Sequence, residues 1–223
     1  MILRRTLAAA LLVASLALGF QGTHPVTGRR IAGVMGMSGA DWLVRPEREA
    51  EEKPDLALDG MGIKPGMKIA DMGSGVGYMT LRMAKRVGPT GKIYGVDLQP
   101  GMLQKLKENA AKAGVTNVEP ILSTVDDPKL PANSVDMILM VDVYHEFSQP
   151  QAMIRKLREA LKADGRLILL EYRAEDPSIP INPDHKMTVG QVKAEIEPEG
   201  FKLQTPIENL PRQHLLILTK TAK

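Results

Sequence analysis

Three glycines at alternate positions, Gly73, Gly75 and Gly77, form the segment of the sequence best suited to holding a ligand. They follow a strand-like apolar segment and precede a segment with helical spacing of apolar residues. Glycine allows the backbone to approach a ligand closely, and a helix that begins after the loop directs unpaired N–H groups toward it. A glycine loop alone is also typical of a dinucleotide site or of a tight turn, so the neighbouring residues must decide.

Side chains next to this glycine loop argue against a dinucleotide. The dinucleotide fingerprint needs Gly or Ala where this chain has Tyr78. Asp71 directly precedes the loop, and a carboxylate there suits a cationic amino-acid group better than a pyrophosphate, which it would repel. Asp97 lies about twenty residues beyond the loop, at the end of the next strand-like segment, where an acid accepts both ribose hydroxyls.

The combined pattern resembles motifs I and II of the class I S-adenosylmethionine (SAM)-dependent methyltransferases, and it looks most similar to the small-molecule enzymes of quinone biosynthesis. The resemblance implies that SAM binds at the carboxyl ends of the strands, with the glycines along its methionine part. It also implies that Asp71 positions the loop or the ligand amine, that Asp97 binds the ribose and that Leu98 packs on the adenine. The cofactor-binding residues predicted in this way are Asp71, Gly73, Ser74, Gly75, Gly77, Tyr78, Asp97, Leu98, Asp126 and Asp142.

The acid that the family places against the adenine amino group is the weakest part of this resemblance. The segment from Ser123 to Pro128 departs from the commoner Gly-Asp-Ala pattern, and Thr124 stands near the usual acidic place. Asp126 is the best remaining candidate. Asp126 and Asp127 are equally well explained as solvated turn residues before a proline.

Polar residues after the apolar segment 135–141 are the candidates for chemistry, in the place of the family's motif IV. We expect them beside the glycine loop, because ligands of open α/β sheets bind outside the carboxyl ends of the strands. A base is needed only when the methyl acceptor must first lose a proton, and an imidazole titrates near working pH. We therefore predict His145, Glu146 and Tyr144 as catalytic residues. The alternative, that His145 caps a turn and Glu146 pairs with an arginine of the next helix, stays open.

Other residues are weaker candidates. Trp42 either folds over the site or packs a helix on the sheet. Residues 171–173 either reach the acceptor pocket or form a surface ion pair. The four histidines show no metal-ligand spacing and the chain has no cysteine, so we predict no metal site. The lack of thiols also argues against an arsenite-type acceptor.

Alternating strand and helix patterns must position these residues. Apolar spacing predicts an α/β fold, a Rossmann-like three-layer sandwich whose mostly parallel sheet is closed by an antiparallel strand at one edge. The resemblance implies seven strands with the last antiparallel. We expect strands at 67–71, 92–97, 118–124, 135–141, 166–172, 201–204 and 214–220, and helices at 41–52, 55–61, 78–87, 102–113, 151–161 and 188–199.

The first 22 residues are of a different kind. Arg4 and Arg5 precede an uncharged run from Leu7 to Phe20, and small residues at 17 and 19 complete the pattern of a secretory signal. A retained membrane anchor is the alternative, although the run is short for a spanning helix. We predict a signal peptide or anchor at 1–22, an irregular and helical lid at 23–62 and a SAM-binding domain at 63–223. This organisation implies an exported, periplasmic or membrane-anchored protein, or a cytoplasmic one if translation starts at Met35 or Met37.

Composition excludes some partners. The formal net charge is only +3 and no dense Lys/Arg block is present, so we predict no nucleic-acid partner and membrane contact only through the N-terminal segment. Two other functions fit the same motifs: an aminopropyl transferase, and an exported module that binds a nucleoside-like ligand without turnover. The intact glycines and acids favour a SAM-dependent methyltransferase acting on a small molecule; the oligomeric state and the atom methylated are left open.

Overall fold

The computed structural model describes residues 22–222, so the predicted signal segment lies outside the described residues except for its last one. These residues build a seven-stranded sheet with the order β3-β2-β1-β4-β5-β7-β6. Neighbouring strands pair in parallel except at β7, which is antiparallel to both β5 and β6. The strands are β1 (Lys68–Met72), β2 (Lys92–Asp97), β3 (Val118–Leu122), β4 (Val135–Val141), β5 (Leu161–Tyr172), β6 (Phe201–Leu203) and β7 (Gln213–Lys220). The predicted fold class is confirmed.

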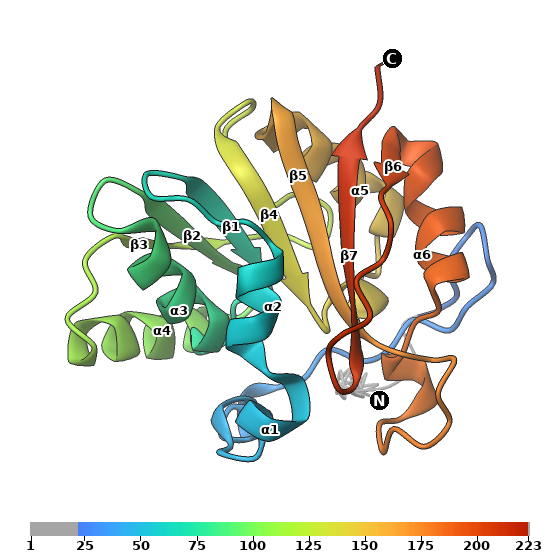
Figure 1. Cartoon of the computed structure of the whole chain (residues 1–223), viewed down its shortest axis with the longest axis horizontal. Coiled ribbons are helices and arrows are strands. Elements are labelled where there is room, and N and C mark those ends of the chain that lie inside the picture. Colours follow the sequence, from blue (N-terminus) through green and yellow to red (C-terminus); the bar gives the residue numbers. More distant parts are fainter. Residues whose placement is uncertain (1–21, 223) are drawn as a thin grey trace, which may run out of the picture.

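Helices cover both faces of the sheet (Figure 1). Apolar residues of α2 and α3 pack on the face that Ile69 and Leu139 present, and α4 lies on the same side because its Leu106 contacts Gly95. Helices α5 and α6 cover the opposite face, with Ile138 and its neighbours. The helices are α1 (Arg48–Glu52), α2 (Pro54–Gly60), α3 (Tyr78–Val87), α4 (Pro100–Lys112), α5 (Pro150–Ala160) and α6 (Val189–Ile196), with short 3₁₀ turns η1 (Met37–Gly39), η2 (Trp42–Val44), η3 (Tyr144–Glu146), η4 (Pro183–His185) and η5 (Glu197–Glu199).

Three predicted elements differ from the structure by more than two residues or are interrupted, each for a local reason. The helix expected at 41–52 is broken into η2 and α1, because Pro46 forces Arg45 into an extended conformation with φ −58° and ψ 142°. The helix that begins after Thr188 stops as an α-helix at Ile196, two residues before Pro198. Strand β5 begins at Leu161, directly after α5, five residues before its predicted start at Arg166; a register shift between Val135 and Met137 of β4 accommodates these additional residues.

The N-terminal segment crosses the edge of the sheet at which the parallel strands end. In Figure 1 it runs from beside α6 along the lower edge of the sheet to α1. Its anchor on α6 is the buried carboxylate of Glu195, which accepts bonds from Thr27 and from Nε and Nη2 of Arg29, both 3.1 Å away. The backbone N–H of Ala32 and the Arg29 guanidinium both donate to the carbonyl oxygen of His145. This segment is therefore fixed against the loop that follows β4.

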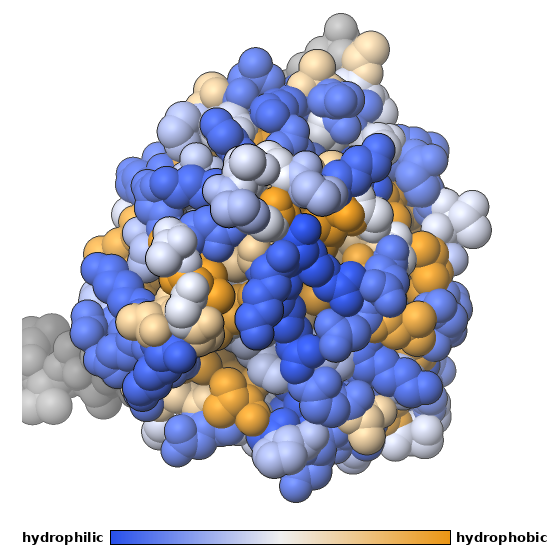
Figure 2. Space-filling model, turned by 60° about the vertical axis from the view of Figure 1, so that its left-hand side comes forward, coloured by the Kyte–Doolittle hydropathy of each residue, from blue (hydrophilic) through white to orange (hydrophobic). Residues whose placement is uncertain are grey.

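The surface carries no single large apolar area on the face drawn in Figure 2, where polar side chains surround separate apolar patches. Among residues 22–222, no helix is both long enough and apolar enough to cross a membrane.

Candidate active site

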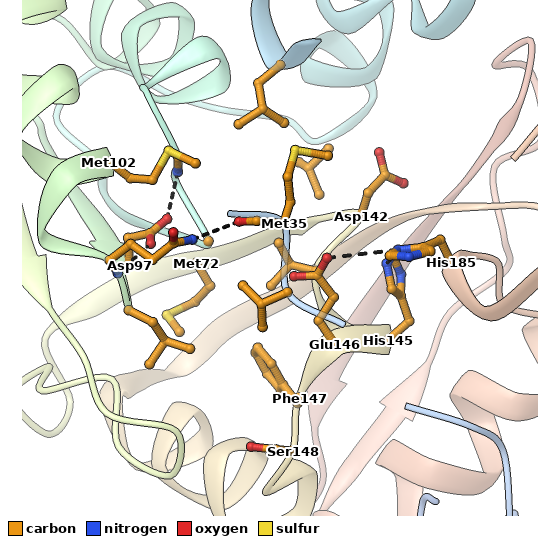
Figure 3. Close-up of a pocket in the computed structure, with 18 of the residues that line it drawn as sticks. Met35, Met72, Asp97, Met102, Asp142, His145, Glu146, Phe147, Ser148 and His185 are labelled. Carbon is orange, nitrogen blue, oxygen red and sulfur yellow. Dashed lines mark hydrogen bonds and ion pairs between the residues drawn. The ribbon is translucent and has the colours of Figure 1, made fainter. Parts of the chain in front are cut away.

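A cavity of about 370 Å³ opens where the parallel strands end, and its size is within the range of small-molecule sites. Its walls come from the loops after β1, β2, β3, β4 and β5 and from the N-terminal segment. In Figure 3, Asp97 and Met102 lie at one end, His145 and His185 lie at the other, and Met35 and Glu146 lie between them. Seven of the predicted site residues line the cavity: Gly73, Gly75, Asp97, Leu98, Asp142, His145 and Glu146.

The glycine loop adopts a backbone that side chains would not allow. Gly73 has φ +67°, and a Cβ there would lie 2.3 Å from Cγ2 of Val143. Gly77 has φ +97°, and a Cβ there would lie 2.4 Å from Cδ1 of Leu106 on α4. The N–H groups of Gly73 and Ser74 both donate to the carbonyl oxygen of Val96 on β2, at 2.8 and 3.0 Å. Gly77 thus permits close helix packing, whereas Gly73 and Gly75 bring bare backbone to the cavity wall.

Asp97 holds this loop and faces the cavity at the same time. One carboxylate oxygen accepts the N–H of Gly75 at 2.9 Å, and the other accepts the N–H of Gln99 at 2.9 Å. Burial raises the pKa of Asp97, and the backbone donors only partly oppose this effect. Each oxygen retains a lone pair for a further donor. The carboxylate is therefore free to accept hydroxyl groups from a ligand, next to the apolar side chains of Leu98 and Met102.

Asp142 is the most unusual acid of the site. It has the left-handed φ of +52°, which is rare outside glycine. Its Oδ2 accepts a hydrogen bond from Nε2 of Gln213 at 2.8 Å. Its Oδ1 is one of two buried side-chain nitrogen or oxygen atoms within residues 22–222 that have no hydrogen-bond partner. Burial and the charges of Glu52 and Glu171 raise the pKa of Asp142. A cationic donor in the cavity would complete its hydrogen bonds and lower this cost.

Asp71 does not line the cavity. Its buried carboxylate accepts the hydroxyl of Thr80 at 2.5 Å, and this bond fixes the start of α3 against the end of β1. Burial raises the pKa of Asp71 to about 7. Two roles were predicted for Asp71, positioning the loop or the ligand amine; its side chain lies beneath the glycine loop, outside the cavity wall.

A buried ion pair orients His145. Its Nδ1 lies 2.6 Å from Oε2 of Glu171 on β5, and the other oxygen of Glu171 accepts the N–H of Tyr144 at 3.0 Å. Burial lowers the pKa of His145, but attraction to Glu171 and their hydrogen bond outweigh it, so that the pKa is raised. Nε2 of His145 points away from Glu171, toward Nδ1 of His185 at 3.1 Å.

Glu146 lies in the middle of the cavity and not on an arginine of α5. Its Oε1 lies 3.9 Å from Nδ1 of His185 (Figure 3). Burial is the main reason that its pKa rises to about 7. Because an acid with this pKa exchanges protons near neutral pH, Glu146 is a second group able to handle a proton in the site.

Four predicted residues lie away from the cavity, besides Asp71 and Gly77. Tyr144 is fully buried, its hydroxyl 3.3 Å from Nε2 of His24, with its ring edge-on to Phe147. Tyr78 donates to Glu49 at 2.6 Å. Ser74 is buried below the loop, and Asp126 is exposed and accepts the hydroxyl of Thr124 at 2.8 Å. None of these four side chains reaches the cavity wall.

The N-terminal segment contributes cavity residues that the sequence did not indicate. Arg48 lines the wall and is held by Glu52 at 2.6 Å, and Glu52 also accepts the hydroxyl of Tyr172 at 2.8 Å. The carbonyl oxygen of Met35 accepts Nε2 of Gln99 at 2.8 Å. Trp42, for which two roles were open, lines the cavity while its ring stacks on Arg45. His185 comes from η4, forty residues after His145, so the spacing of residues in the sequence did not indicate that the two side chains meet.

Comparison with known proteins identifies the family. Residues 63–209 match the family described as "Methyltransferase domain", and the chain belongs to this family. It is 28% identical over 148 residues to an arsenite methyltransferase of Halobacterium salinarum, which covers 62% of this chain and 38% of that protein. It is also 28% identical over 118 residues to the ubiquinone/menaquinone biosynthesis C-methyltransferase UbiE of Escherichia fergusonii, covering 52% of this chain and 47% of that protein.

A solved structure supports the same family assignment. A SAM-dependent methyltransferase from Aquifex aeolicus superposes with a TM-score of 0.78 at 27% sequence identity, covering 83% of this chain and 99% of that one. The matched region spans less than half the length of the two curated relatives named above.

The buried acid Asp71 makes a testable contribution to pH dependence. Its pKa rises from 3.8 to about 7 on folding. Between these pH values the unfolded chain has lost this proton and the folded chain has kept it, so the stability it confers at low pH is lost as pH rises. We expect the free energy of unfolding of the wild type to fall relative to that of Asp71→Asn as pH rises across this range. Urea denaturation of ligand-free protein at several pH values measures this; a difference that stays constant with pH would contradict it.

Proposed function

We propose that the chain is a SAM-dependent methyltransferase that acts on a small-molecule acceptor. The observation that carries this proposal is the buried, unpartnered oxygen of Asp142 at the wall of the cavity that Gly73 and Asp97 also line. SAM carries a positively charged amino group and sulfur together with a ribose, and these groups match the acids of the cavity. Membership of the methyltransferase domain family supports the same ligand.

The residues of the cavity fit SAM as follows. Asp97 accepts the ribose hydroxyls, and Leu98 and Met102 provide an apolar surface for the adenine. Bare backbone at Gly73 allows the methionine part to lie against the loop, and Asp142 accepts its amino group. When bound, SAM supplies a methyl group on a positively charged sulfur: the bond from the acceptor atom to the methyl carbon forms as the carbon–sulfur bond breaks, and that electron pair stays on sulfur.

The acceptor then binds at the end of the cavity that holds His145, Glu146 and His185. When His145 is neutral, the carboxylate of Glu171 keeps the remaining proton on Nδ1, and the lone pair of Nε2 faces His185 at the acceptor end. An acceptor that must lose a proton gives it to this nitrogen. Enclosure by the N-terminal segment excludes water and aligns the two reactants, which supplies much of the rate.

The acceptor that we propose is small, partly apolar and of the quinone type. The acceptor end combines the polar groups above with Phe147, Pro180 and Ile181 on the cavity wall. The match to UbiE supports a ring compound of this kind. The match to an arsenite methyltransferase is of similar strength, but arsenite chemistry uses thiols and this chain has no cysteine.

We also propose that the chain is exported and that a signal is cleaved off within residues 1–22. The charge and apolar pattern of these residues supports export. A start at Met35 or Met37 would remove Thr27 and Arg29 and leave Glu195 buried without those partners, at a large cost in stability. We expect mass spectrometry of the native protein to find a chain that begins near Phe20 or Gln21. A chain that still begins at Met1 would contradict cleavage.

Replacing the predicted ribose acid tests the cofactor site. We expect Asp97→Ala to weaken SAM binding roughly 10- to 100-fold, because a hydrogen bond to a charged group is worth about 1.5–3 kcal/mol. Calorimetric titration measures the dissociation constant. The control is Asp164→Ala, which removes an exposed acid from β5 and leaves the affinity unchanged. Equal affinities for wild type and Asp97→Ala would refute the placement of the ribose.

Methyl transfer itself is tested with labelled SAM and fractionated small-molecule extracts. We expect label to enter a quinone-type product with the wild type, and His145→Ala to lower the rate by about a hundredfold or more, the range of a lost general base. The affinity for SAM should remain within about twofold of wild type, because His145 lies at the other end of the cavity from Asp97 (Figure 3). No transfer from any fraction, or an undiminished rate in the variant, would count against the proposal.

A further inference from the structure

Two imidazoles and a carboxylate meet at the acceptor end of the cavity. Nε2 of His145 lies 3.1 Å from Nδ1 of His185, and that nitrogen lies 3.9 Å from Oε1 of Glu146. One ligand atom from each of these residues lies within 4.8 Å of the others. Figure 3 shows the carboxylate of Glu146 directed at the pair of rings. His185 neither accepts the proton nor holds the cofactor in the proposed methyl transfer, so its contact with His145 calls for a separate explanation.

The spacing of these atoms matches one shared cation. Nitrogen and oxygen ligands lie about 2.0–2.2 Å from Zn²⁺, which puts neighbouring ligand atoms roughly 3.0–3.5 Å apart. The two imidazole nitrogens already have this separation. Oε1 of Glu146 must approach Nδ1 of His185, now 3.9 Å away, by about half an ångström. Its distance to the nitrogen of His145 is within 4.8 Å and must shorten by up to about 1.5 Å, which rotation of the Glu146 side chain allows.

The surroundings of His145 give a second, independent reason. Glu171 is fully buried and accepts a hydrogen bond from Nδ1 of His145 at 2.6 Å. Its other oxygen is held by the backbone N–H of Tyr144, so the carboxylate cannot turn away. Histidines that bind metals usually donate their second nitrogen to a carboxylate or carbonyl oxygen in this way, which fixes the ring and leaves the other nitrogen for the metal.

The charges of the cluster point the same way. Glu146 and Glu171 bring two carboxylates to a largely buried place. The guanidinium of Arg29, which contacts the carbonyl oxygen of His145, is already paired with Glu195. A divalent cation between neutral imidazoles would balance the two acids.

We propose that His145, His185 and Glu146 bind a divalent transition-metal cation at the acceptor end of the cavity. Two nitrogen ligands and one oxygen ligand suit Zn²⁺ or Fe²⁺, whereas Mg²⁺ and Ca²⁺ prefer oxygen ligands throughout. Three protein ligands leave coordination positions open toward the cavity. The site would thus bind a metal ion, which the spacing of histidines in the sequence did not indicate.

A bound cation would also restrict the acceptor to molecules with an oxygen donor at the reacting end. It would hold that oxygen and lower its pKa, so that the acceptor binds as the anion with its proton already released to solvent. Nε2 of His145 would then coordinate the cation in place of accepting a proton. This role rests on the proposed methyl transfer. The cation site itself does not, because it follows from the geometry of the three side chains.

The test is a titration of tag-free, chelator-treated full chain with Co²⁺, without SAM, followed by visible absorption and by competition with Zn²⁺. We expect one Co²⁺ per chain with ligand-field bands that Zn²⁺ abolishes. His185→Gln and Glu146→Gln should each weaken binding at least tenfold. The matched controls are His214→Gln and Glu159→Gln; His214 is held by Glu175 and Glu208 outside the cavity, and Glu159 is exposed on α5, so both should bind as the wild type does.

Two outcomes would overturn the proposal: no stoichiometric Co²⁺ binding, or binding that His185→Gln and Glu146→Gln leave unchanged. Either would mean that the two rings are joined only by a hydrogen bond. His185 is partly exposed, so its replacement leaves the core intact, and circular dichroism confirms the fold of each variant. SAM titration of the metal-free chain separates the two proposals. A chain that binds SAM but fails to bind Co²⁺ rejects the cation site alone. A chain that binds Co²⁺ but fails to bind SAM rejects the proposed function alone.

Discussion

The structure depends on the burial of four acids at one edge of the sheet. Asp71, Asp97, Asp142 and Glu171 stand at or just beyond the carboxyl ends of β1, β2, β4 and β5, which are neighbours in the sheet. Buried like charges repel one another and lose hydration, so each acid needs donors or a proton. The protein provides Thr80 for Asp71, two backbone N–H groups for Asp97, and His145 for Glu171. Asp142 is left with one oxygen without a hydrogen-bond partner. A cationic ligand that donates to this oxygen gains the most binding free energy.

The N-terminal segment closes the same edge, and its own buried charges fix where it lies. Glu195 holds Arg29 on one side of the cavity, and Glu52 joins Arg48 to Tyr172 on the other. Buried ion pairs add little net stability compared with apolar packing, but breaking one leaves a costly uncompensated charge. These buried ion pairs therefore fix the position of the N-terminal segment more than they stabilise the fold. Residues between these two anchors, including Met35 and Trp42, are thus held over the cavity, and a small acceptor must fit beneath them.

The sequence predicted those helices, strands and site residues whose positions depend on neighbouring residues in the chain. The bounds of α3, β2 and β4 match the predicted ranges, because amphipathic helices have strong periodicity and strands buried on both faces appear as short apolar runs. The glycine loop and Asp97 line the cavity because strand order brings the ends of β1 and β2 together. Tyr144 and His145 show where this reasoning stops: they are adjacent, but the turn η3 directs one ring into the core and the other to the cavity. His185 and Arg48 reach the cavity through long-range contacts, which carry no periodic signal in the sequence.

The central claim is that this acidic edge binds SAM, and calorimetric titration of the full chain with SAM and with its demethylated product tests it most directly. We expect one molecule of each per chain, in competition for the same site, with the product bound at least as tightly as SAM. Decarboxylated SAM should bind more weakly, as expected for a methyltransferase and not for an aminopropyl transferase. Failure of both SAM and its product to bind would contradict the account, whatever else the cavity holds.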